Sequence, residues 1–72
     1  MNNLNMAKIQ LNGDPFEINI GSNLSELLNK LKVEKNKVAI EVNGEIVHKD
    51  KYSNLVLNKD DKVEIVHFIG GG

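Results

Sequence analysis

The spacing of the apolar residues changes twice along this chain, from a period of two to a helical period and back to two. Apolar and polar residues alternate in 7–11 and 16–20, as in strands that bury one face. Leucines at 24, 27, 28 and 31 then form a single helical stripe, and alternation returns in 38–42, 45–48 and 62–68. The order of elements is therefore hairpin, helix, hairpin, irregular crossover and strand.

Turn and cap signals mark the ends of these elements. Asn43-Gly44 predicts a type I′ turn, since both central residues of that turn need a positive φ. Residues 12–15 collect four turn formers and predict a longer turn, with Pro15 at the entrance of the second strand. Asn23 is the expected N-cap of the helix, and Glu26 stands three residues on, as in a capping box.

These elements predict an α+β domain in which a mixed sheet of four to five strands packs on one helix. If the last strand pairs with the first, it runs through the middle of the sheet and its end projects into solvent. The irregular crossover spans residues 49–58, and Tyr52 and Leu55 are its expected core anchors. This is the β-grasp, or ubiquitin-like, arrangement. We expect residues 1–6 to be a disordered extension, 7–69 a single domain and 70–72 a flexible tail.

Composition argues against several functions. A chain of 72 residues has little interior for a deep catalytic pocket in addition to a core, which disfavours an enzyme acting alone. The absence of cysteine excludes disulfides, thiolate metal sites and thiol catalysis. All basic residues are lysine and the net charge is -1, so nucleic-acid binding is not expected. No apolar run approaches the ~20 residues that span a bilayer, and we expect a cytoplasmic protein without a membrane partner.

The titratable side chains offer no catalytic constellation. His48 and His67 have no partner at the spacing of a dyad or a metal site. Asp60-Asp61 is better explained as a solvated turn. We therefore expect no catalytic residue, no metal and no bound cofactor.

The last strand and the residues after it form the candidate functional site. Val63 and Ile65 are the natural buried pair, which leaves Val66 and Phe68 on the solvent side. Together with Ile69 they are a candidate docking surface for a partner. The alternative is that Phe68 folds back over a sheet edge.

Gly70, Gly71 and Gly72 follow this strand without a polar break. Without a side chain, glycine can thread its backbone through a narrow channel. A C-terminal carboxylate has a pKa of about 3.3–3.7 and is ionised at neutral pH. Gly72 is therefore the candidate reactive group, and Gly70 and Gly71 supply its reach. A linker or a flexible end is the alternative interpretation of a glycine run.

Four segments and the terminal glycines carry a family resemblance that covers nearly all of the chain after Met6. The segments are Ile-Gln-Leu-Asn-Gly at 9–13, Asn-Leu-Ser-Glu-Leu-Leu at 23–28, Val-Ala-Ile-Glu-Val-Asn-Gly-Glu-Ile-Val at 38–47 and Asp-Lys-Val-Glu-Ile-Val at 61–66. In this order they closely resemble the ThiS family, the sulfur carrier proteins of thiamin biosynthesis.

The resemblance implies a carrier that other enzymes act on and that is not itself an enzyme. An adenylating enzyme of the ThiF type would use ATP and magnesium to convert the Gly72 carboxylate to an acyl-adenylate. Sulfur from a persulfide donor enzyme would displace AMP and leave a thiocarboxylate. A thiazole synthase of the ThiG type would accept that sulfur. The free carrier is expected to be a monomer.

Three positions depart from the family pattern. Asp60 stands where a glycine is usual, although Asp tolerates the left-handed region better than most residues. His48-Lys49 replaces Pro-Arg, so Lys49 is expected to serve docking less well if that arginine has such a role. The third departure is the third terminal glycine, since two would suffice.

Other β-grasp proteins remain as alternatives. The small subunit of molybdopterin synthase is a sulfur carrier that ends in Gly-Gly, and a ubiquitin-like modifier would be joined to lysines. From another class, TGS domains of synthetases and GTPases share the Val-Asn-Gly hairpin and the Asp-x-Val-Glu-Ile strand. They are binding or regulatory modules that need no free Gly-Gly end, so a sequence ending at Gly72 favours a carrier.

Overall fold

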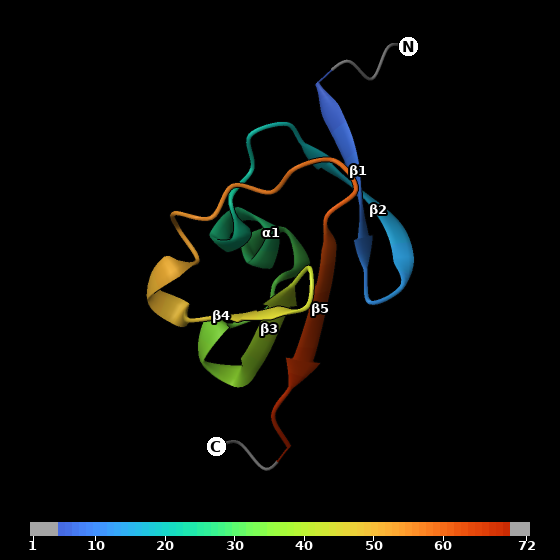
Figure 1. Ribbon diagram of the computed structural model, residues 1–72. Helices are drawn as coiled ribbons and strands as arrows, with labels where there is room; N and C mark the ends of the chain where they lie inside the picture. The colour runs from blue at the N-terminus through green and yellow to red at the C-terminus, as the bar shows by residue number, and fades with distance from the viewer. Residues whose placement is uncertain (1–4, 70–72) are drawn as a thin grey trace.

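The last strand of the chain lies in the middle of the sheet (Figure 1). This computed structural model describes residues 5–69, and the five strands have the order β2-β1-β5-β3-β4. β1 and β5 are parallel, and the other neighbours are antiparallel. The elements are β1 (Met6–Leu11), β2 (Asp14–Asn19), α1 (Leu24–Leu31), the 3-10 helix η1 (Lys35–Lys37), β3 (Val38–Val42), β4 (Glu45–Val47), the 3-10 helix η2 (Lys49–Lys51) and β5 (Lys62–His67). The predicted mixed sheet on one helix is confirmed.

The first hairpin is tighter than the sequence predicts. Leu11 pairs with Asp14, so Asn12 and Gly13 alone form the turn, with φ values of 50° and 87°. Two consecutive positive φ values are those of a type I′ turn. The predicted turn over 12–15 is therefore wrong at Asp14 and Pro15, which belong to β2. Because β2 is an edge strand, the missing N–H of Pro15 can face away from the sheet at little cost.

The sheet also begins earlier than predicted. Met6 pairs with Asn19, and the carbonyl of Asn5 accepts a hydrogen bond from the N–H of Ile20 at 2.8 Å. Met6 therefore belongs to β1, and Asn5 is tied to the residue after β2, so neither belongs to the predicted extension over 1–6. The rest of that extension, 1–4, and the predicted tail, 70–72, lie outside the described residues.

The helix α1 has the predicted cap and the predicted buried stripe. Asn23 Oδ1 accepts from the N–H of Glu26 at 2.8 Å, and Glu26 Oε1 accepts from the N–H of Asn23 at 2.8 Å. Leu24, Leu27 and Leu28 are buried against the sheet. The leucine stripe is thus the core and not a partner-binding face.

We expect Asn23→Ala to lower the free energy of unfolding by about 1 kcal/mol, because the substitution leaves an N–H of the first helical turn without its side-chain acceptor. Denaturant unfolding measures this loss. Asn29→Ala is the matched control, since Asn29 is exposed within the same helix and alanine is a better helix former. An equal loss at Asn29 would contradict the capping interpretation.

The second half of the chain has the predicted turns, but one residue of its crossover that was not predicted is buried in the core. Asn43 and Gly44 have φ values of 53° and 85°, as a type I′ turn requires. Tyr52 is buried as predicted, whereas Leu55 is only half-buried and Leu57 is the second buried anchor. Asp60 adopts a φ of 71°, so this residue occupies the left-handed conformation in place of the usual glycine.

The hydrophobic core lies between α1 and the inner face of the sheet. Its members come from the helix, four strands and the crossover: Ile9, Ile18, Leu24, Leu27, Leu28, Val38, Ile40, Val42, Tyr52, Leu57, Val63 and Ile65. Between residues 5 and 69, no helix combines the length and the apolar character that crossing a membrane requires.

Candidate functional site

β5 carries the chain from the core to the surface. Val63 and Ile65 are 1% and 8% exposed, whereas Val66 is 62%, Phe68 46% and Ile69 99% exposed. The predicted division of the strand into a buried and a solvent-facing side is confirmed. The N–H of Phe68 still donates to the carbonyl of Lys37 at 2.9 Å, which keeps the backbone in line with β3 one residue beyond the strand.

The register of the sheet extends this apolar surface to two further strands. Ala39 of β3 lies directly opposite Val66, and Ile46 of β4 lies opposite Glu41, so their side chains share the outer face. Ile46 is 68% exposed. We call the following five residues the outer patch: Ala39, Ile46, Val66, Phe68 and Ile69.

Ile46 and Ala39 were not among the residues predicted from sequence. The Asn43-Gly44 turn nevertheless carries the signal for Ile46, because a two-residue turn fixes which residues of the two strands face each other. The pairing of Ala39 with Val66 depends on the β3–β5 register, which no local motif sets.

Two carboxylates lie opposite each other beside the outer patch. Glu41 of β3 pairs in register with Glu64 of β5, and both are exposed. Like charges that are directly opposite destabilise a sheet. Across residues 5–69 the single ion pair is Lys37 to Glu34, at 3.2 Å, so neither of these glutamates has a cationic partner in that part of the chain. The exposed Lys62 stands on the same side of β5 as Glu64 and lines one surface hollow with both glutamates, without forming an ion pair with either. The outer face therefore combines apolar surface with two opposed carboxylates and a nearby lysine.

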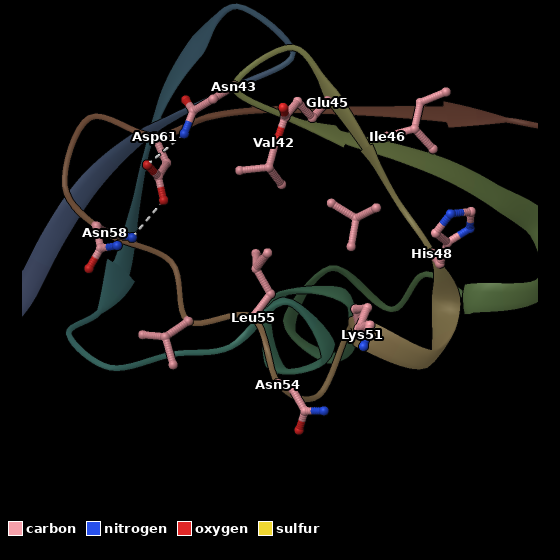
Figure 2. A pocket seen from close by; sticks show the side chains of 12 residues that line it. Val42, Asn43, Glu45, Ile46, His48, Lys51, Asn54, Leu55, Asn58 and Asp61 are labelled. Carbon is pink, nitrogen blue, oxygen red and sulfur yellow. Dashed lines mark hydrogen bonds between the residues drawn. The ribbon is translucent and has the colours of Figure 1, made fainter.

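A surface pocket of about 510 Å³ lies between β4 and the crossover that follows it (Figure 2). On one side, Asp61 Oδ1 accepts from Asn43 Nδ2 at 3.0 Å, and Asp61 Oδ2 accepts from the N–H of Asn58 at 2.7 Å. Asn43 Oδ1 in turn accepts from the N–H of Lys62 at 2.9 Å. These bonds tie the β3–β4 turn to the start of β5, so the polar groups of this wall have a structural role.

The pocket shows no arrangement for catalysis. His48 lies at the far side of the pocket from Asp61, whose two carboxylate oxygens already accept hydrogen bonds (Figure 2). No group of three His, Asp or Glu residues that could hold a metal occurs in the described range 5–69. None of the lining residues belongs to β5, so the pocket is separate from the end of the chain.

Tyr52 is an anchor and not a reactive group. Its side chain is 2% exposed, and burial raises the pKa of Tyr52 above its ordinary value of 10.0. The phenol is therefore neutral near neutral pH. The carbonyl of Tyr52 accepts from the N–H of Ser25 at 3.0 Å, which joins the crossover to the start of α1.

The predicted reactive residue Gly72 and the predicted threading residues Gly70 and Gly71 lie outside the described residues. What the structure supplies is the strand that leads to them. Its last described residues, Phe68 and Ile69, are exposed and apolar.

Comparison with known proteins identifies the family. A sequence model of the ThiS family matches residues 9–72. The chain belongs to the ThiS family. This confirms the resemblance found in the sequence, and the fold agrees with it: the crystal structure of a thiamine biosynthesis protein (ThiS) from Geobacter metallireducens superposes with a TM-score of 0.79 and 32% identity, covering 90% of this chain and 99% of that one.

Two relatives of known name differ greatly in length. The sulfur carrier protein ThiS of Bacillus subtilis is 38% identical over 66 residues, which cover 89% of this chain and 98% of that protein. The thiazole synthase of Magnetococcus marinus is 46% identical over 65 residues, which cover 90% of this chain but only 20% of that protein. This ThiS family member thus spans a fifth of the length of that thiazole synthase.

Proposed function

We propose that this chain carries sulfur for thiamin biosynthesis as a thiocarboxylate on Gly72. The Gly72 carboxylate attacks the α-phosphate of ATP, which a ThiF-type adenylating enzyme holds with magnesium, and pyrophosphate leaves. The terminal sulfur of a persulfide on a donor enzyme then displaces AMP. A thiol reductant cleaves the resulting sulfur–sulfur bond and leaves the thiocarboxylate. A thiazole synthase takes the sulfur from this group.

The observation that carries the proposal is the exposure of Phe68 and Ile69 directly before the glycines. A buried side chain at this point would tie the end of the chain to the domain, whereas an exposed end can enter the active site of another protein. The chain also contains no cysteine, so any sulfur that it carries must be bound elsewhere than on a side-chain thiol. A terminal carboxylate meets this requirement.

The outer patch is the proposed docking surface for the adenylating enzyme. Its apolar residues Val66, Phe68 and Ile69 lead directly to the reactive end, so an enzyme that binds them holds Gly72 near its own catalytic residues. Glu41 and Glu64 repel each other in the free carrier. A lysine or arginine of the enzyme placed between them would remove that repulsion and help to orient the carrier.

The proposed sulfur acceptor is a thiazole synthase. In the thiazole synthase of Magnetococcus marinus, a segment similar to this chain forms part of one longer protein. Joining a carrier-like segment to an enzyme in one chain raises their effective concentration relative to each other. This supports the same pairing between the present chain and a separate thiazole synthase.

Intact-mass measurement tests the proposal. After incubation with an adenylating enzyme, a persulfide donor, a thiol reductant and ATP, we expect the mass increase of one oxygen replaced by one sulfur. Fragmentation should place this increase on Gly72, and a parallel incubation without ATP should show no change. An unchanged mass with all components present would refute the proposal. An increase by a whole protein would instead indicate a ubiquitin-like modifier.

A further inference from the structure

β5 pairs with its two neighbouring strands over different lengths. Toward β3, pairing runs from Val63 opposite Val42 to His67, the last residue of the strand, opposite Val38. Toward β1, pairing ends at Leu11 opposite Val63, where β1 turns away into β2. Figure 1 shows the β1–β2 hairpin beside the first part of β5, with the remainder of the strand extending past it.

The hydrogen bonds show which backbone groups this leaves without a neighbour. Phe68 N–H bonds to Lys37 and the carbonyl of Lys62 accepts from Asn43, so the even-numbered residues of β5 are directed at β3. The odd-numbered residues are directed at β1, since the carbonyl of Val63 accepts from Asn12 at 2.9 Å.

Asn12 makes the last contact on this edge of β5. Its side-chain Oδ1 accepts from the N–H of Ile65 at 2.8 Å and so replaces the backbone partner that β1 no longer offers. His67 is the next residue of β5 whose backbone N–H and carbonyl are directed at this edge. Neither its N–H nor its carbonyl has a hydrogen-bond partner within residues 5–69. A central strand therefore has an open edge at its C-terminal end.

We propose that an extended segment of the adenylating enzyme adds to this open edge as a strand and takes the position that β1 leaves. The N–H and carbonyl of His67 then donate to and accept from the backbone of the enzyme. Strand addition of this kind gives affinity through main-chain bonds. This inference rests on the proposed function, because it names how the partner holds the same chain end.

The position of His67 argues for the adenylating enzyme as occupant. Gly72 is five residue steps after His67, and an extended chain rises ~3.3 Å per step, so the two lie at most about 17 Å apart. A strand that pairs with His67 would fix the direction in which the remaining residues leave the domain. The exposed side chains of Val66 and Phe68 flank His67 and belong to the proposed docking surface, which continues onto this edge.

Amide hydrogen exchange of the full chain, followed by NMR, tests this inference directly. In the free carrier we expect the His67 amide to exchange fast and the Phe68 amide to exchange slowly, because only Phe68 donates to the fold. Saturating adenylating enzyme should slow exchange at His67 at least tenfold and leave Phe68 slow. Exchange at His67 that stays at its free rate in the complex would overturn the inference. Concentration-dependent protection in the carrier alone would also overturn it, since a second copy would then occupy the edge.

A matched pair of variants gives an independent measurement. His67→Pro removes the unused N–H and keeps the extended backbone, so thermal unfolding should match the parent chain. His67→Ala removes the imidazole and keeps the N–H. We expect the KM for the carrier in ATP–pyrophosphate exchange to rise at least tenfold in His67→Pro and to change less than twofold in His67→Ala. Equal KM values in the two variants would contradict strand addition, whereas absence of exchange with the parent chain would refute the proposed function itself.

Discussion

A chain that lacks Gly71 and Gly72 is expected to fold normally and to lose ATP-dependent activation completely. β5 ends at His67, and Ile65 is the last buried residue that the structure describes, so the deletion removes no described core contact. The truncated chain still ends in a glycine carboxylate, that of Gly70. That carboxylate lies about 7 Å short of the original one in an extended chain. ATP–pyrophosphate exchange catalysed by the adenylating enzyme should fall to background, and circular dichroism should give the melting temperature of the full chain.

The double substitution of Gly71→Ala and Gly72→Ala tests whether the enzyme requires a tail of a given length or also a tail without side chains. This variant keeps the length and the terminal carboxylate and adds only two methyl groups. If the enzyme encloses the tail in a narrow channel, the variant should lose most of its activity despite its full length. If only length matters, it should retain that activity. Full exchange activity in the truncated chain would contradict the assignment of Gly72 as the reactive residue.

Much of the fold follows from local patterns in the sequence, because each pattern reports on the few residues around it. The two-residue period of β5 predicted that Val63 and Ile65 face the core and Val66 faces solvent, and the exposures confirm it. The leucine stripe and the capping box likewise set the position and the buried face of α1. These features need only a strand or helix with one face turned to a core.

The errors arise where contacts with other segments, and not the local composition, decide the conformation. Asp14 and Pro15 have the composition of a turn, but pairing with β1 places them in a strand. In the crossover, Leu55 and Leu57 cannot be ranked by periodicity because the segment has no regular structure. The N–H of Leu57 donates to the carbonyl of Ser22 at 2.8 Å, and this contact ties the segment to the loop before the helix.

The candidate site divides in the same way. The exposed end of β5 could be predicted from its own alternation. The position of Ala39 beside Val66 and the opposition of Glu41 and Glu64 depend on the β3–β5 register. The open edge at His67 depends on where β1 leaves the sheet, and only the assembled structure shows this point.

Ile65 and Val66 are neighbours in the sequence, but alanine should reduce the stability of the fold at Ile65 and the affinity for the adenylating enzyme at Val66. Ile65 lies in register with Ile40 and is 8% exposed, whereas Val66 is 62% exposed on the outer face. We expect Ile65→Ala to lower the free energy of unfolding by about 2–5 kcal/mol, since it leaves a cavity in the core. Cores of domains this small supply only about 3–5 kcal/mol, so much of this variant should be unfolded near physiological temperature. Denaturant unfolding of both variants measures the difference.

Val66→Ala should cost less than about 1 kcal/mol of stability, because the side chain that it shortens already faces water. Its effect should appear in binding: the affinity for the adenylating enzyme should fall several-fold if Val66 contacts that enzyme. Ile65→Ala, measured at a temperature where it is folded, should bind with the affinity of the parent chain, because its side chain does not reach the outer face. Should both variants lose affinity in proportion to their lost stability, binding would report folding alone, and the outer patch would not be the docking surface.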